Sequence, residues 1–151
     1  MAKDLINELP DSLYQNLQKF DLVLLSTIYE NKQPFVNAVS WVFAPTTKKI
    51  RFSVDSKSQI ITNIKANQNV ALSMFSGETI YSINGKGNLL TEEIEGIPFK
   101  LAIVEVDVES VHEVMFYGSK ISSPPEYQKT YNPAAAEKLD QQVLTALKNY
   151  K

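Results

Sequence analysis

Three apolar stretches near the start of the chain are separated by polar turns too short to hold a helix. The stretches are residues 22–29 (LVLLSTIY), 34–44 (PFVNAVSWVFA) and 50–55 (IRFSVD), and the turns are ENKQ and PTTKK. Their β-branched and aromatic residues are typical of strands. Parallel strands need long crossover connections, whereas antiparallel strands are joined by short turns. We therefore predict an antiparallel meander of three strands.

The second half of the sequence predicts three more strands. Residues 70–75 (VALSMF) and 79–90 (TIYSINGKGNLL) are joined by the tight loop SGE, and Gly85 and Gly87 indicate a bend or bulge in the second of them. Residues 99–114 alternate apolar and polar positions, which predicts a long strand with one face in water. Six antiparallel strands favour a small barrel, because closing the sheet removes its exposed edges.

Three helices complete the predicted fold. Residues 9–20 read as an amphipathic helix, and residues 58–67 (SQIITNIKAN) form a short helix after the third strand. The last helix starts at Pro133 with Asn132 as its cap, after an irregular loop that contains several prolines. No repeat or long linker divides the 151 residues. The expected fold is mainly β with flanking helices, one domain over 1–151, with a barrel core at about 22–118 and a C-terminal loop and helix at 119–151.

Composition excludes several classes of site. The chain has no cysteine and a single histidine, His112, which excludes disulfides, thiolate catalysis, Cys-ligated zinc and histidine clusters, so we predict no metal site. The net charge of −2 and the lack of a basic stripe argue against nucleic-acid binding. We see no signal peptide or membrane span and expect a cytoplasmic protein without a membrane partner. Arg51 is the only arginine.

Three segments, in order and at matching spacing, resemble one known family. They are LLSTIYENKQPFVNAVSWVFA, IRFSVDSKSQIITNIKANQNVALSMF and LAIVEVDVESVHEVMFYG, which together run from about Leu22 to about Gly118. They are similar to the pyridoxamine 5'-phosphate oxidase-like family, the flavin-binding split barrels. The resemblance implies a six-stranded split β-barrel that forms a homodimer. It also implies two molecules of flavin mononucleotide (FMN) in clefts between the subunits, with a small-molecule substrate.

The resemblance also implies a set of cofactor-binding residues. The family's Ser-Arg-Lys motif falls on Ser58, Gln59 and Ile60, so only the serine is kept; Gln59 can still donate a hydrogen bond, and Lys57 could replace the lost cation. By the same matching, Ser53 lies near the ribityl chain or the phosphate. Ser40 and Trp41 lie where split barrels line the flavin ring. The predicted FMN-binding residues are therefore Ser40, Trp41, Ser53, Lys57, Ser58 and Gln59.

Each of these residues also has a plain structural reading. Ser58 or Asp55 would simply cap the helix at 58–67, with Lys57 in solvent, because helix N-termini need such caps. Trp41 would be a core or dimer-interface residue. Tyr127 and Tyr131 would lie either in a surface loop or in a lid over the cleft. No catalytic residue is predicted, since a flavin carries the chemistry itself.

Two functions of different classes follow. The first is an FMN-binding protein that acts as a flavin-dependent oxidoreductase on an unidentified small molecule. It would not be a genuine pyridoxamine phosphate oxidase, because no arginine follows Arg51 and His112 lies in a different setting from the family's histidine. The alternative is a non-enzymatic dimeric split barrel that binds another small ligand, such as haem, or a partner protein. A haem ligand could use only His112 as a strong neutral ligand.

Overall fold

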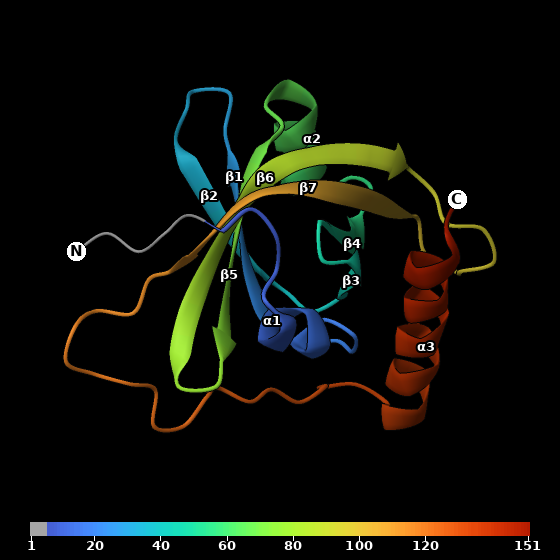
Figure 1. Ribbon diagram of the computed structural model, residues 1–151. Coiled ribbons are helices and arrows are strands. Elements are labelled where there is room, and N and C mark those ends of the chain that lie inside the picture. Colours follow the sequence, from blue (N-terminus) through green and yellow to red (C-terminus); the bar gives the residue numbers. More distant parts are fainter. Residues whose placement is uncertain (1–5) are drawn as a thin grey trace.

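The computed structural model describes residues 6–151, which form an antiparallel sheet and three helices (Figure 1). The helices are α1 (Asp11–Asn16), α2 (Gln59–Ala66) and α3 (Pro133–Asn149). The strands are β1 (Val23–Ile28), β2 (Pro34–Val39), β3 (Val42–Thr46), β4 (Lys49–Asp55), β5 (Asn69–Ser76), β6 (Thr79–Thr91) and β7 (Leu101–Glu113). The mainly antiparallel β fold, the helix after IRFSVD and the helices near both ends are confirmed. The first helix is shorter than the predicted 9–20.

The number of strands corrects the prediction of six: residues 6–151 contain seven in one sheet, in the order β2-β1-β5-β6-β7-β4-β3. The predicted strand 34–44 is in fact two strands, because the chain leaves β2 at Val39 and enters β3 at Val42. Ser40 and Trp41 lie between them, and the Val42 amide donates to the Ser40 carbonyl at 2.9 Å. This break contains neither glycine nor proline, so the sequence carries no turn signal there.

The sheet is open, which corrects the prediction of a closed barrel. β2 and β3 are the two edge strands of the described sheet and do not pair with each other. Yet only two residues separate them along the chain, so the sheet must curl until its two edges approach at Ser40 and Trp41. Pro34 begins β2 and Pro45 lies within β3. Proline cannot donate to a ladder and is confined to edges, so these prolines were the available sign that the segment is not a central strand.

The main core lies inside the curl of the sheet. Leu13 of α1 and Leu17, just after it, are completely buried there, and the isoleucines of α2 pack into the same cluster. Ile60, Ile61 and Ile64 recur at helical spacing, which gives α2 one apolar face. α2 follows β4 directly, so its N-terminus is held against the end of that strand.

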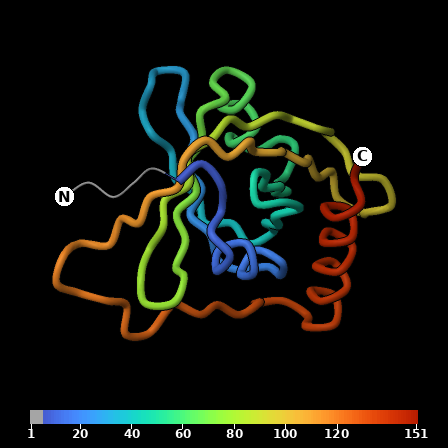
Figure 2. The backbone as a smooth tube through the Cα atoms, viewed as in Figure 1, coloured from blue at the N-terminus to red at the C-terminus, as the bar shows by residue number. Residues whose placement is uncertain are grey.

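A second apolar cluster fixes α3 against the outer side of the sheet. Val143 and Leu147 of α3 are fully buried against Phe43 of β3 and Ile103 of β7. α3 therefore covers the outward face of β7 near the start of the strand, at Ile103. The rest of that face is left for polar residues. Figure 2 shows the chain between β7 and α3 as a long loop that runs around the outside of the molecule. At the end of this loop the Asn132 side chain accepts from the Ala135 amide at 3.1 Å, which confirms the predicted cap.

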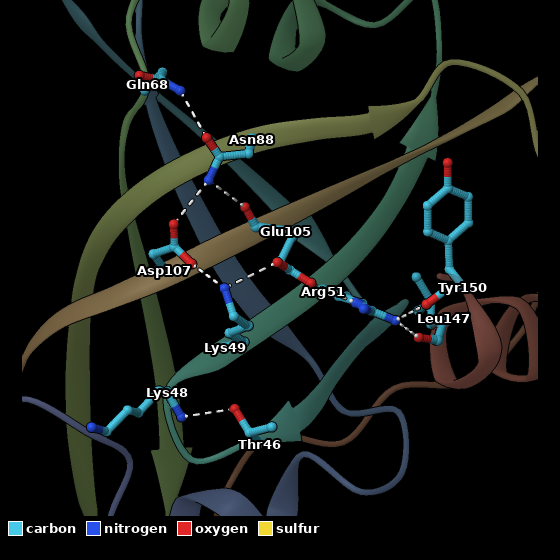
Figure 3. Close-up of polar contacts among 10 residues, drawn as sticks. All are labelled: Thr46, Lys48, Lys49, Arg51, Gln68, Asn88, Glu105, Asp107, Leu147 and Tyr150. Carbon is cyan, nitrogen blue, oxygen red and sulfur yellow. Dashed lines mark hydrogen bonds and ion pairs between the residues drawn. The ribbon is translucent and has the colours of Figure 1, made fainter.

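The only arginine ties α3 to the sheet (Figure 3). The Arg51 Nε donates to Glu105 at 2.9 Å, and one terminal nitrogen of Arg51 donates to the carbonyls of Leu147 and Tyr150 at 2.8 and 3.0 Å. The Leu147 carbonyl belongs to the last turn of α3 and the Tyr150 carbonyl to its C-cap residue, where no intrahelical donor is available. Lys49 continues the network, and its ion pairs with Asp107 and Glu105 raise its pKa.

The pairing of β6 with β7 contains a bulge, as the glycines of β6 predicted. The pairing moves from Asn84 with Ser110 to Gly85 with Val108, which leaves Glu109 as the extra residue. Gly85 lies against the backbone of β7, and a Cβ at this position would be 2.3 Å from the Asp107 carbonyl oxygen. Gly85 therefore permits the close approach that the bulge requires.

Among residues 6–151, no helix has the combination of length and apolar character needed to cross a lipid bilayer.

Candidate functional site

The turn between β4 and α2 is organised by Asp55. Its Oδ1 accepts from the Lys57 amide at 2.8 Å, and its carbonyl accepts from the Ser58 amide at 3.0 Å. Ser58 occupies the N-cap position of α2 with extended backbone, but its side chain makes no capping hydrogen bond. The Ser58 hydroxyl therefore does not cap α2, although the position of Ser58 in the sequence suggests that it would.

Four side-chain oxygens around this turn and the neighbouring edge strand are buried without a hydrogen-bond partner. They are the hydroxyls of Ser53, Ser56 and Ser58 and the Oδ1 of Asn37. Ser53 is 2% exposed. Buried polar groups in native proteins are almost always paired, so several such groups close together in the chain require an explanation. A ligand with acceptor oxygens would supply partners for the three hydroxyls, and a donor group on the ligand would supply one for Asn37 Oδ1.

A cleft of about 430 Å³ opens beside these oxygens. Its walls come from the edge strand β2, the break before β3, the end of β4, the start of α2 and the loop that precedes α3. The lining residues are Asn37, Ala38, Val39, Ser40, Trp41, Ser53, Val54, Asp55, Ile60, Lys129 and Tyr131. Asp55 and Ile60 lie on either side of the serine turn, so the cleft reaches that turn. Six of these eleven residues are apolar or aromatic and five are polar or charged, so the cleft combines an apolar surface with polar groups, as small-molecule sites do.

The wall formed by Trp41 is fixed by α3. The Trp41 Nε1 donates to Asp140 Oδ1 at 2.8 Å, and the Lys129 ammonium donates to the same oxygen at 3.2 Å. The Lys129 ammonium also lies 5.9 Å from the centroid of the Trp41 ring, within the range of a cation–π contact. The Trp41 carbonyl accepts from the Ser53 amide at 3.0 Å, which joins this wall to β4. The orientation of Trp41 is thus set from two sides.

The six predicted cofactor residues do not all meet in this cleft. Ser40, Trp41 and Ser53 line it. Ser58 lies at the turn beside it, with its unpaired hydroxyl buried. The Lys57 side chain is exposed and does not line the cleft. The Gln59 side chain donates to Asn63 Oδ1 at 2.7 Å and lines a separate hollow beside Tyr29 and Thr62.

Eight of the eleven lining residues were not among the predicted cofactor residues, and Asn37, Lys129 and Tyr131 are three of those that carry a polar side-chain group. Asn37 is a polar residue between Phe35 and Val39 on the inward face of β2, and that interruption of an apolar face was a usable signal. Lys129 and Tyr131 come from the loop before α3. Tyr127 and Tyr131 were expected either in a surface loop or in a lid over the cleft. Tyr131 lines the cleft, and Tyr127 does not. No local pattern could place Lys129 beside Trp41.

Three solved structures share this fold. A candidate pyridoxamine 5'-phosphate oxidase from Lactobacillus delbrueckii is 20% identical with a TM-score of 0.61, and the match covers 71% of this chain and 95% of that one. An F420 reductase is 19% identical with a TM-score of 0.57 over 69% of this chain and 98% of that one. HupZ from Group A Streptococcus is 15% identical with a TM-score of 0.56 over 74% of this chain and 95% of that one.

A comparison with curated proteins gives no match. A family model described as pyridoxamine 5'-phosphate oxidase does match, over residues 9–114. This range includes α1, all seven strands of the described sheet and the turn between β4 and α2. It ends before the loop and helix that carry Lys129 and Asp140. The order of the elements and the matched range lead to one conclusion: the chain belongs to the pyridoxamine 5'-phosphate oxidase family.

Proposed function

We propose that this protein binds FMN in the cleft between β2, β4 and the loop before α3, and that it is a flavin-dependent oxidoreductase acting on a small molecule. The observation that carries the proposal is the group of buried, unpaired hydroxyls of Ser53, Ser56 and Ser58 around the β4–α2 turn. Hydroxyl donors at the start of a helix suit a phosphate, because the helix N-terminus also presents free N–H groups and a partial positive charge.

The residues at the site fit the proposed cofactor. Ser53, Ser56 and Ser58 are hydrogen-bond donors from which no group of residues 6–151 accepts, and a phosphate supplies several acceptor oxygens. Ser40, Trp41 and Asn37 line the rest of the cleft and would contact the remainder of the flavin. Asp55 is also nearby, but its Oδ1 is held by the Lys57 amide. When bound, FMN would supply the electron transfer, while the chain binds, orients and shields it.

A first experiment measures FMN and riboflavin binding by the quenching of flavin fluorescence. Wild-type protein is expected to bind FMN with a dissociation constant of about 1 µM or better, the range that gives useful occupancy, and to bind riboflavin, which lacks the phosphate, more weakly. Ser58→Ala is expected to weaken FMN binding about fivefold or more and to leave riboflavin binding unchanged, because a charge-assisted hydrogen bond is lost. Ser123→Ala, an exposed serine in the loop before α3, is the matched control.

The stability of the ligand-free Ser58→Ala variant separates the two readings of this serine. A hydroxyl without a partner contributes nothing favourable to the apo fold, so its removal should not lower the melting temperature. A capping serine would cost about 1 kcal/mol when replaced.

Absence of saturable FMN binding up to the millimolar range would contradict the proposal. It would favour the non-enzymatic alternative, a split barrel that binds another small ligand or a partner protein.

We further propose that two copies of the chain form a homodimer through the segment after β7. Phe116 is 69% exposed, Tyr117 is fully exposed and Val114 is half exposed, and they adjoin a hollow of about 980 Å³ that reaches Ile6 and Tyr81. A contiguous apolar patch of this kind usually marks an interaction site. A second copy would cover it and would place its own surface near the end of β7.

Phe116→Asp is expected to shift the protein from dimer to monomer in sedimentation-velocity measurements, by placing a charge in an apolar interface. Tyr127→Asp, which changes a half-exposed aromatic residue of the loop outside this patch, should leave the dimer intact. A wild-type protein that is monomeric at tens of micromolar would contradict the proposed dimer without affecting the FMN measurement.

A further inference from the structure

We propose that Lys129, from the loop beyond the family-matched residues, is the cation that binds the phosphate of FMN in this protein. The inference rests on the proposed FMN site and adds a residue that the family match, which ends at residue 114, does not contain. The matching of the family's Ser-Arg-Lys motif leaves glutamine and isoleucine where two cations are expected. A phosphate carries nearly two negative charges, and a contact with a cation would add to what the neutral hydroxyl and amide donors of the turn supply.

Among residues 6–151, Lys129 is the only basic residue that lines the cleft. Ser53 lines the same cleft, and its hydroxyl is buried without a hydrogen-bond partner. The Lys129 side chain is 28% exposed, which leaves it partly shielded from solvent. A partly buried charge is screened less than a surface charge and interacts more strongly with a ligand.

Lys57 is the alternative source of positive charge, and the structure places it less favourably. Its side chain is exposed and is not part of the cleft wall, although its backbone amide helps to form the turn. An exposed ammonium contributes little to a pair, because water and salt screen it. Lys129 is therefore the better placed of the two lysines.

Asp140 is the positioning residue for Lys129. Its Oδ1 accepts from both the Trp41 Nε1 and the Lys129 ammonium, so it holds the ammonium beside the indole ring. The contact with Lys129 is long, at 3.2 Å, and an ammonium carries three donors. Donors remain for a phosphate, while the carboxylate keeps Lys129 at the cleft.

The test compares the ratio of riboflavin to FMN dissociation constants, since the two ligands differ only in the phosphate. Lys129→Met is expected to lower this ratio about tenfold by weakening FMN binding alone, because one charge-assisted contact is lost. The same variant should lose most of the salt dependence of FMN binding. Lys148→Met is the matched control: Lys148 also lies over an aromatic ring, 5.7 Å from the Phe43 centroid, but does not line the cleft.

Two further variants make the test specific. Asp140→Asn keeps an oxygen that accepts from Trp41 but removes the charge that holds the Lys129 ammonium at the cleft, so it should weaken FMN binding several-fold without changing riboflavin affinity. Lys57→Met should leave the ratio within about twofold of wild type, as expected for a solvent-screened charge.

Several results would overturn the inference. One is an unchanged ratio of riboflavin to FMN dissociation constants in Lys129→Met, and another is a tenfold fall of this ratio in Lys57→Met. A third is an equal loss of affinity for both ligands in Lys129→Met, which would place the lysine at the flavin ring. These failures are distinct from failure of the proposed function, in which wild-type protein binds neither flavin.

Discussion

Arg51→Met is expected to lower the free energy of unfolding by about 3 kcal/mol, the lower end of the range for breaking a buried ion pair from one side. The Arg51 side chain is 14% exposed, as is that of its partner Glu105. Its loss removes the donors to the Leu147 and Tyr150 carbonyls and leaves the Glu105 carboxylate with Lys49 alone. Urea unfolding, followed by circular dichroism, measures the change in midpoint and slope.

Two variants control for the loss of charge. Arg51→Lys keeps the charge but has no planar fork, so it cannot donate to Glu105 and the helix carbonyls together and should recover only part of the stability. Lys49→Met removes a neighbouring charge that is 44% exposed and should cost under about 1 kcal/mol. If Arg51→Met costs no more than Lys49→Met, then α3 is held by the buried contacts of Val143 and Leu147, and the arginine is unimportant for its docking.

Gly85→Ala is the second change with a large expected effect, about 3 kcal/mol of destabilisation or more. The added methyl group would lie 2.3 Å from the Asp107 carbonyl oxygen and 2.7 Å from Val106 Cγ1, so two paired strands must separate. Overpacking against side chains alone typically costs 1–3 kcal/mol, and a backbone atom cannot move aside as a side chain does. Thermal unfolding should show a fall in melting temperature of roughly 10 °C for a chain of this size.

Gly87 provides the matched control on the same strand. A Cβ at Gly87 would lie 3.3 Å from Val104 Cγ1 and 3.4 Å from Ile64 Cγ2, contacts that small side-chain shifts can relieve. Gly87→Ala should therefore change the free energy of unfolding by less than about 1 kcal/mol, because the lower entropy of alanine in the unfolded chain partly offsets the cost of these contacts. Equal effects of the two substitutions would mean that the close approach at Gly85 is not what constrains β6.

The sequence predicted the interior of most elements well because their signals are local. The isoleucines of α2 and the alternating valines of β7 each have the period of their element, and both elements are confirmed. Residues 34–44 were misread because the chain crosses between the two edges of the sheet through Ser40 and Trp41, and this pair contains no glycine or proline to mark the break. Tertiary contacts determine where this strand ends, and a local sequence pattern does not contain that information.

The candidate site was predictable only where it follows a matched segment. Ser40, Trp41 and Ser53 lie in the family-matched range, and all three line the cleft. Lys129 and Asp140 come from a part of the chain with no matching motif. Trp41 and Asp140 are 99 positions apart in the sequence and are joined by one hydrogen bond, which depends on how α3 docks. The same docking places Lys129, which bonds to Asp140, at the cavity.

The open sheet has a thermodynamic consequence for any molecule that occupies the cleft. One wall comes from β2 at one end of the strand order and another from β4, next to the opposite end, so a bound ligand is a non-covalent cross-link between the two ends of the sheet. The unfolded chain has no such cleft. Ligand at a hundred times its dissociation constant would therefore add about 2.7 kcal/mol to the free energy of unfolding. That gain is comparable to the loss expected for Arg51→Met, so a saturating ligand would nearly offset the loss of the Arg51 contacts.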